Sequence, residues 1–410
     1  MSTQHESGLS LLQVSQERYQ DNPYLLYHQL RELDPVYWDE QIQGWVLTRY
    51  KDVIKTLRDP HFSAVRFNFN VDWLPPMFQE VVQPTIYAIT RQMLFLDPPD
   101  HTRIRSLTAR AFTPRVVESM RNEIQQLVDR LLDQMQEKGQ ADLMADFAYP
   151  LPAIVIAQLL GVPPEDRERF ILWAGDLSML LESTNITEDD AIRALYGMRE
   201  FTEYFRQLIA QRAQAPRDDL LQALINAHEG LDKLSEDELL SNCMLLLAAG
   251  HGTTTHLLSN GFVALARHPE QFAWLKAHPD QTSLAVMELL RYDGPVQATS
   301  RLATSDLEIG GKHIQAGQNV LISLGAASHD PEQFADPDVL HLDRKENHHM
   351  AFGQGIHFCL GAPLARLEAE IAFRALSQRL STASLVDEQH VQWFSGMVFR
   401  GVSTLPITFN

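Results

Sequence analysis

Apolar residues recur at intervals of three and four along most of this chain, and polar residues fill the positions between them. That spacing places the apolar side chains on one face of an α-helix, so it predicts a chain built mainly of helices. The longest such pattern spans residues 234–268. The other helical patterns cover residues 23–33, 113–135, 152–160, 166–181, 189–213 and 364–380.

Strand patterns are fewer and shorter. Runs rich in β-branched and aromatic residues occur at residues 36–40, 44–49, 306–324 and 405–409, and they predict small β-sheets. No Gly/Ser-rich or Pro-rich linker and no internal repeat divides the chain. We therefore expect one mainly α domain with small β-sheets over residues 22–410, preceded by an N-terminal tail over residues 1–21.

Composition narrows the function classes. The chain has 53 acidic and 34 basic residues, and its net charge of −19 argues against nucleic acid as a partner. Its two cysteines cannot form a disulfide framework, and the N-terminus lacks the pattern of a signal peptide. Apolar runs such as residues 244–250 are far shorter than the roughly 20 residues that cross a bilayer. We expect a cytoplasmic protein that does not enter a membrane.

The two cysteines differ in their surroundings. Cys359 lies between a glycine-bearing loop and the start of the helical pattern at residues 364–380. Backbone NH groups at a helix N-terminus favour negative charge, so this placement favours a thiolate, which is a nucleophile or a metal ligand. Glycines around the sulfur let main chain lie against a flat, bulky group such as a haem. Cys243 lies in an apolar run and is predicted to belong to the core.

The residues around Cys359 resemble, position by position, the haem-binding signature of the cytochrome P450 superfamily. The matching residues are Phe352, Gly353, Gly355, His357, Cys359, Gly361 and Ala362. The resemblance, which extends from about residue 22 to the C-terminus, implies a single-domain cytochrome P450 fold of the soluble bacterial type. It also implies haem b as the cofactor, with the Cys359 thiolate as the axial iron ligand that favours cleavage of the O–O bond of dioxygen.

A carboxylate and a guanidinium three residues apart, Glu288 and Arg291, match the ExxR motif of that family. On a helix this spacing allows an ion pair, although most such pairs are exposed and contribute little stability. Arg344 follows at the position that the family pattern predicts. The resemblance implies that the three residues form a buried network that supports the haem loop and takes no part in the chemistry.

Four basic residues match family positions that bind the two haem propionates. They are His101, Arg105, Arg301 and His357. His101 and Arg105 are four residues apart, so they share a face of a predicted helix. Any one of them taken singly is equally well explained as a surface charge or a core histidine. Taken together, they indicate an anion site.

Residues 248–255 place glycines and threonines in the middle of the longest helical pattern. Both residue types oppose regular helix, which favours a local distortion there. In the family this place forms a groove for dioxygen and for proton delivery, and Ala249, Gly250 and Thr253 match it. Gly252 stands where relatives carry Asp or Glu. Ala249 and Thr253 are four residues apart, so we expect them to share a helix face and His251 to point away from it. We therefore expect the Thr253 hydroxyl and ordered water, with or without a polar group of the substrate, to carry the proton relay.

The segments that form the substrate pocket in the family correspond here to residues 61–95, 170–201, 296–299 and 397–399, and they are largely apolar. The candidate wall residues are Leu94, Ala248, Val296, Val398 and Phe399. Each is equally well explained as ordinary core. As pocket residues they indicate a mid-sized hydrophobic substrate.

The resemblance implies a monomeric monooxygenase that hydroxylates or epoxidises a polyketide, macrolide, terpenoid or fatty acyl chain. Because the chain has no flavin or iron–sulfur motif, the electrons would come from a separate ferredoxin and its NAD(P)H-dependent reductase. The ferredoxin would dock on a basic patch of Arg110, Arg115, Lys345 and Arg366. Two alternatives stay open: a haem enzyme that uses peroxide, desaturates or cleaves C–C bonds, which Gly252 keeps open, and a haem sensor without turnover.

Overall fold

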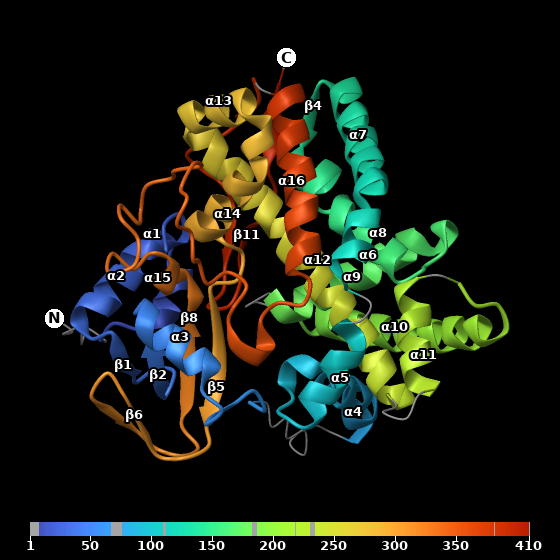
Figure 1. Cartoon of the computed structure of the whole chain (residues 1–410), viewed down its shortest axis with the longest axis horizontal. Coiled ribbons are helices and arrows are strands. Elements are labelled where there is room, and N and C mark those ends of the chain that lie inside the picture. Colours follow the sequence, from blue (N-terminus) through green and yellow to red (C-terminus); the bar gives the residue numbers. More distant parts are fainter. Residues whose placement is uncertain are drawn as a thin grey trace.

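The computed structural model of the chain describes residues 8–66, 76–109, 112–182, 187–217, 219–229, 234–380 and 382–409. Helices make up most of these residues, and the largest sheet lies on one side of the molecule (Figure 1). The expectation of a mainly α chain with small β-sheets is confirmed.

The helices mostly begin and end close to the predicted limits. In chain order they are α1 (Glu17–Gln20), α2 (Tyr24–Leu33), α3 (Tyr50–Arg58), α4 (Pro76–Thr90), α5 (Asp100–Ala109), α6 (Pro114–Ser119), α7 (Arg121–Lys138), α8 (Pro150–Leu159), α9 (Arg167–Glu182), α10 (Glu188–Gln214), α11 (Leu220–Glu229), α12 (Glu236–Arg267), α13 (Pro269–Ala277), α14 (Thr282–Asp293), α15 (Leu324–Ser328) and α16 (Ala362–Arg379).

The strands are short. They are β1 (Val36–Asp39), β2 (Gly44–Leu47), β3 (Phe62–Ser63), β4 (Gln140–Asp142), β5 (Ala298–Ala303), β6 (Leu307–Ile309), β7 (Lys312–Ile314), β8 (Asn319–Ser323), β9 (Ser384–Leu385), β10 (Trp393–Ser395), β11 (Arg400–Val402) and β12 (Pro406–Thr408). The largest sheet has the order β1-β2-β8-β5-β3, and β2 and β8 are parallel neighbours within it.

One predicted helix is divided in two. The pattern over residues 113–135 becomes α6 and α7, which meet at Met120. The Thr113 side chain caps α6 by accepting from the Val116 NH. At the other end, the Ser119 hydroxyl donates to the Val116 carbonyl. A side chain that bonds to nearby backbone competes with helix continuation, which is consistent with a break at this point.

The long central helix α12 begins with a capping box, in which the side chains of Ser235 and Glu238 bond to each other's backbone NH. It then runs without a break to Arg267. The glycines and threonines at residues 248–255 therefore do not break the helix. The Thr253 hydroxyl donates to the Ala249 carbonyl at 2.8 Å, which is the bond to the preceding turn from which a local distortion was predicted.

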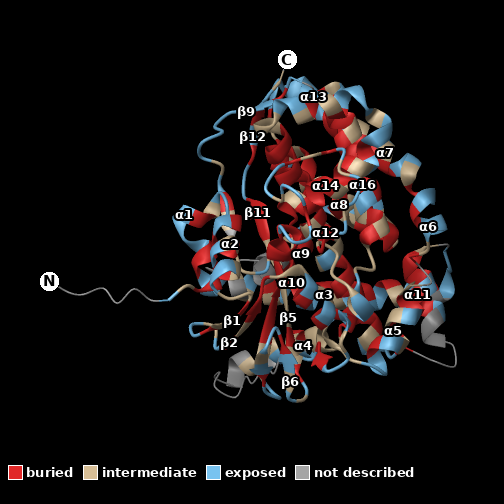
Figure 2. Ribbon diagram, turned by 60° about the vertical axis from the view of Figure 1, so that its left-hand side comes forward, coloured by how far each residue is buried: buried red, intermediate tan, exposed pale blue. Residues whose placement is uncertain are grey.

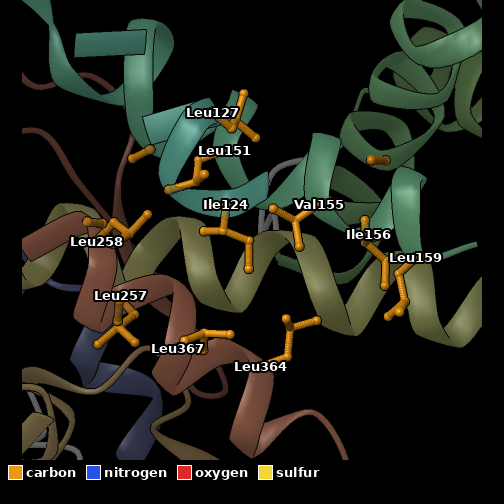
Figure 3. Packing of buried hydrophobic residues seen from close by; sticks show 14 of the residues in the cluster. Ile124, Leu127, Leu151, Val155, Ile156, Leu159, Leu257, Leu258, Leu364 and Leu367 are labelled. Atoms are coloured by element: carbon orange, nitrogen blue, oxygen red, sulfur yellow. The ribbon is translucent and has the colours of Figure 1, made fainter. Parts of the chain in front are cut away.

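The main hydrophobic core surrounds α12. Figure 3 shows Val155 and Ile156 of α8 on one side of this helix and Leu364 and Leu367 of α16 on the other. These side chains are buried, and each such burial contributes roughly 1.5–3 kcal/mol. Figure 2 shows that, in the whole molecule, buried residues gather toward the centre and exposed residues lie on the outer faces of helices such as α13. The core therefore holds α12 and α16 in fixed relation.

Part of the segment that we assigned to an N-terminal tail packs against the domain. Leu11, Val14 and Tyr19 are buried in a cluster with side chains of α2. The Leu11 NH donates to an Asp39 carboxylate oxygen at 2.8 Å. Within the described residues, the helices are too short or too polar to cross a membrane.

Candidate functional site

The cysteine loop, residues 352–361, leads into α16. The Cys359 NH donates to the Phe352 carbonyl at 3.0 Å, which closes the loop. Gly353 and Gly355 have positive φ angles of 65° and 74°, which side-chain-bearing residues rarely adopt. At Gly355 a Cβ would also lie 2.3 Å from the Leu57 carbonyl oxygen of α3. Of the three glycines that match the family signature, Gly353 and Gly355 are thus favoured by the backbone of the loop, whereas Gly361 has an ordinary φ of −80°.

The surroundings of the Cys359 thiol have opposite effects on its pKa. Burial raises its pKa, whereas hydrogen bonds from the backbone NH groups of Gly361 and Ala362 and the charge of Arg105 lower it. Burial prevails, so the pKa of the thiol is raised. The NH groups at the start of α16 thus act in the direction that the sequence predicts, but burial outweighs them. A thiolate at this place needs a further cation, such as a metal ion bound to the sulfur.

Cys243 contrasts with Cys359. It is completely buried in α12, and burial raises the pKa of its thiol to about 12. Its predicted place in the core is confirmed.

Five basic side chains gather beside the cysteine loop. They are Arg66, His101, Arg105, Arg301 and His357. The rings of His101 and His357 lie with their centroids 4.1 Å apart. Arg105 donates from its guanidinium to the Phe358 carbonyl of the loop. The structure thus brings together the four residues predicted from the sequence, which come from α5, β5 and the cysteine loop.

This basic cluster carries positive charge that the described protein residues balance only in part. Burial and the charges of Arg301, His101, Arg66 and Arg105 lower the pKa of His357 to about 3. Burial also lowers the pKa of His101, which is 2% exposed and whose two ring nitrogens have no hydrogen-bond partner. Buried donors of this kind normally have an acceptor. The cluster therefore fits a ligand with one or more carboxylates.

Sequence reasoning missed Arg66, which follows the short strand β3. Burial and the charge of Arg301 lower its pKa to about 9. Nothing in the local sequence marks this arginine, because its proximity to the cluster arises only when β3 pairs with β5.

The ExxR residues form a buried ion pair. Both side chains are completely buried in α14, and Arg291 donates from Nε and Nη2 to the two carboxylate oxygens of Glu288 at 2.8 and 2.7 Å. The guanidinium of Arg291 also donates to the carbonyls of Ser328, Pro337 and Val339. This side chain therefore ties α14 to α15 and to the segment that leads toward the cysteine loop.

Arg344 completes the network as the sequence predicts. Its Nε donates to Glu288 at 3.0 Å, and its side chain is 11% exposed. Two further donors were not predicted: the His341 NH at 3.1 Å and the Asn347 side-chain amide at 3.0 Å. They lie on either side of Arg344, in a loop without helical or strand periodicity that could have indicated their direction.

The middle of α12 has one face that neighbouring side chains leave open. Ala249 is exposed and Thr253 is partly exposed, although the flanking His251 and Gly252 are buried. The His251 ring packs edge-on against Tyr149 at 4.4 Å, and burial with the charge of His256 lowers its pKa to about 4. As predicted, Ala249 and Thr253 share a face, and His251 points elsewhere.

The predicted wall residues come from separate parts of the chain. Val296 and Phe399 form an isolated antiparallel bridge, and the Gln297 NH donates to the Val398 carbonyl at 2.8 Å. The structure therefore brings Val296, Val398 and Phe399 together. Ala248 is partly exposed on α12, and Leu94, in the 3₁₀ turn Met93–Phe95, and Val398 are 38% and 36% exposed.

Some of the predicted pocket and docking residues lie outside the part of the chain that the structure describes. The predicted pocket segments include residues 67–75 and 183–186, which lie outside the described residues. Of the predicted basic patch, Arg115, Lys345 and Arg366 are exposed, and Arg110 lies outside the described residues.

These features fit a haem. The Cys359 sulfur supplies one ligand, and an iron ion would be the cation that its thiolate needs. The basic cluster with the unpartnered nitrogens of His101 suits two propionates. The uncovered face at Ala249 and Thr253, together with the exposed apolar side chain of Leu94, offers surface for a large flat group.

Comparisons with known proteins agree with this geometry. A family model described as Cytochrome P450 matches residues 77–399. Cytochrome P450 CYP107DY1 of Priestia megaterium is 42% identical over 371 residues, which cover 89% of this chain and 90% of that protein. The polyketide biosynthesis cytochrome P450 PksS of Bacillus subtilis is 38% identical over 403 residues, which cover 96% and 97%. The crystal structure of P450BioI in complex with a hexadec-9Z-enoic acid ligated acyl carrier protein superposes with a TM-score of 0.87 at 39% identity, covering 96% of this chain and 100% of that chain.

Proposed function

This chain belongs to the cytochrome P450 family and is a monooxygenase of that family, and on this premise we propose that it hydroxylates or epoxidises a hydrophobic small molecule. The observation that supports this most directly is the geometry around Cys359. The sulfur lies at the start of α16, beside the basic cluster that can receive two carboxylates. In this proposal the uncovered face of α12, at Ala249 and Thr253, would line the opposite side of the same haem site.

The family implies a haem, and we propose haem b held by residues of this chain. Cys359 would ligate the iron, and His101, Arg105, Arg301, His357 and Arg66 would bind the propionates. Phe352, Gly353 and Gly361 would line the side of the cysteine. When bound, the haem supplies the activation of dioxygen that this chemistry requires. Glu288, Arg291 and Arg344 would hold the loop in place without touching the reacting atoms.

The proton-handling residues in this proposal lie on α12. The Thr253 hydroxyl sits on the uncovered face, one turn from Ala249, whose carbonyl accepts its hydrogen bond. Gly252 offers no side chain to bring protons there. His251 is buried against Tyr149 and its lowered pKa keeps it neutral, so it is no substitute for an acid. Thr253 and water would therefore carry the proton relay.

The substrate in this proposal is a polyketide or a fatty acyl chain. The candidate wall residues Leu94, Ala248, Val296, Val398 and Phe399 are all apolar. PksS is named for polyketide biosynthesis, and the P450BioI structure contains a fatty acid on its carrier protein. An apolar wall binds such chains by the hydrophobic effect and provides few polar groups to select others.

Electrons would come from a ferredoxin and an NAD(P)H-dependent reductase. Arg115, Lys345 and Arg366 are exposed and could meet an acidic ferredoxin. Because Gly252 leaves the proton relay short of an acid, a peroxide-driven reaction is the second candidate: peroxide already carries the two electrons and two protons.

One experiment separates these possibilities. Purified, haem-loaded protein is given hexadec-9Z-enoic acid and assayed with ferredoxin, reductase and NADPH, then with hydrogen peroxide alone, then with neither. Hydroxylated or epoxidised product only in the first assay supports the proposal. Product only with peroxide favours the second candidate, and a haem-free protein would contradict both.

A further inference from the structure

Arg400 stands directly after the candidate wall residue Phe399, at the start of β11. Its side chain is buried, and its Nε donates to a carboxylate oxygen of Asp293 at 2.7 Å. Asp293 is the last residue of α14, the helix that carries Glu288 and Arg291. A buried ion pair thus joins α14, the helix of the ExxR motif, to the C-terminal segment that contains Val398 and Phe399.

The same two side chains reach the N-terminal part of the chain. The two Nη atoms of Arg400 donate to the carbonyls of Gln20 and Asp21 at 2.6 and 2.8 Å. The Tyr24 hydroxyl donates to Asp293 at 2.8 Å. All three guanidinium nitrogens of Arg400 therefore have acceptors, which removes the main penalty for burying the charge.

Backbone bonds transmit this position to the wall. We call residues 296–299 and 397–399 the two wall segments. The Arg400 NH donates to the Pro295 carbonyl at 2.9 Å, the Gln297 NH donates to the Val398 carbonyl, and Val296 pairs with Phe399. The position of Arg400 therefore sets the register between the wall segments.

The central helix α12 fixes the third side of this arrangement. The Asn260 amide donates to the carbonyls of Asp293 and Arg400 at 3.2 and 3.1 Å. One residue on, at Gly401, a Cβ would lie 2.2 Å from Nδ1 of His256, so only glycine lets β11 approach α12 this closely. The pair is thus held against the helix that carries Thr253.

We propose that Arg400 and Asp293 are positioning residues that set the shape of the substrate pocket, a role that rests on the proposed function of the wall segments. Strands β10 and β11 have three residues each and form a two-stranded sheet, and a hairpin of this size is at best marginally stable without support from its surroundings. The forked guanidinium contacts Asp293 and two carbonyls at once, which the single ammonium of lysine cannot reproduce. The pair determines where Val398 and Phe399 lie, and Arg400 itself need not touch the substrate.

The chain contains a matched control. Arg212 and Asp219 form a second buried ion pair, and Arg212 also donates to the Gly161 carbonyl at 2.8 Å. The side-chain exposures are 3% and 16%, against 4% and 10% for Arg400 and Asp293. This control pair joins α10 to the segments around α8 and α11 and makes no bond to the wall segments. An effect that follows from the loss of any buried ion pair should therefore appear in variants of both pairs.

The test compares Asp293→Asn/Arg400→Met with Arg212→Met/Asp219→Asn in haem-loaded full-length protein. Both double variants remove the charges together, so no charge is left buried alone. Dissociation constants are measured from the Soret shift for imidazole, which is small, and for 4-phenylimidazole, whose phenyl group would fill more of the proposed substrate pocket. Hydrogen exchange of residues 393–402 is followed in parallel.

We expect the ratio of the 4-phenylimidazole constant to the imidazole constant to change by about tenfold in the Asp293/Arg400 variant and to stay unchanged in the control. Amide exchange of residues 393–402 should accelerate only in the former. An unchanged ratio, or an equal change in both variants, overturns the proposal. If the double variant does not load haem, Arg400→Lys carries the test, with the same direction of change expected and an unchanged ratio again overturning it. A wild-type protein without a haem-thiolate spectrum would instead contradict the proposed function.

Discussion

At the scale of single residues, the sulfur of Cys359, as the proposed iron ligand, would determine the absorption spectrum of the haem. Because burial raises the pKa of its thiol, the thiolate depends on the iron that we propose it binds. Only a thiolate ligand gives the reduced carbon monoxide complex its red-shifted Soret band. We expect Cys359→Ala to abolish that band in the reduced difference spectrum. Cys243→Ala should leave it intact, and a retained band in Cys359→Ala would show that another residue is the ligand.

The proposed proton delivery also depends on single side chains of α12. We expect Thr253→Ala to increase the peroxide released per NADPH several-fold and to lower product, because the hydroxyl on the uncovered face of α12 is lost. His251→Ala should change this coupling little, since the ring is buried against Tyr149. Gly252→Asp should improve coupling on poor substrates by restoring an acid. Product and peroxide yields measure all three, and the relay is wrong if Thr253→Ala couples normally or His251→Ala uncouples.

At the scale of elements, the Glu288 network joins α14, α15 and the segment before the cysteine loop. Removing one member of a buried ion pair leaves the other charge unpaired, at roughly 3–5 kcal/mol. Arg291→Ala should therefore give haem-free or insoluble protein, as judged from the ratio of Soret to 280 nm absorbance and from thermal melting.

The surface offers a control for this prediction. Arg206 pairs with Glu203 at the same i,i+3 spacing, but both side chains are about half exposed. Arg206→Ala should change stability by no more than about 1 kcal/mol, because exposed pairs contribute little. A haem-loaded Arg291→Ala protein with the melting temperature of the wild type would contradict the buried network.

At the scale of the whole molecule, buried histidines link stability to pH, and His251 and His349 are two of them. Burial and the charge of His256 lower the pKa of His251 to about 4. Burial and the charges of Arg366 and Arg291 lower the pKa of His349 to about 4. In the unfolded chain an imidazole titrates near pH 6.5. Below that pH the unfolded state binds more protons, so the stability that these residues contribute is present above pH 6.5 and is lost as the pH falls toward 4.

We expect the melting temperature to fall as the pH is lowered from 6.5 to 4. Over this range, each such histidine lowers the free energy of unfolding by up to about 1.4 kcal/mol per pH unit. His251→Gln should reduce this slope, because it removes one of the buried imidazoles that contribute to it. Melting curves at fixed ionic strength across this range measure the effect. A slope in His251→Gln equal to that of the wild type would contradict the assignment.

The sequence by itself determined the helical fold and the cysteine loop, because helical periodicity and the glycines around Cys359 are local properties that the chain carries in its own order. It also determined that Glu288 and Arg291 share a helix face. It misjudged one local feature, the break at Met120, which depends on a side chain bonding to nearby backbone. At the Cys359 thiol it indicated the effect of the helix N-terminus but not the burial that outweighs it.

Only the tertiary structure decided which distant residues meet. Arg66 joins the basic cluster through the pairing of β3 with β5, and Asn347 joins the Glu288 network through a loop without periodicity. Arg400 and Asp293 lie 107 positions apart, and neither carries a local signal of its partner. The physical reason is that an ion pair is selected by burial and by the direction of each side chain. Both are set by packing around α12, and neither is encoded in the spacing of residues along the chain.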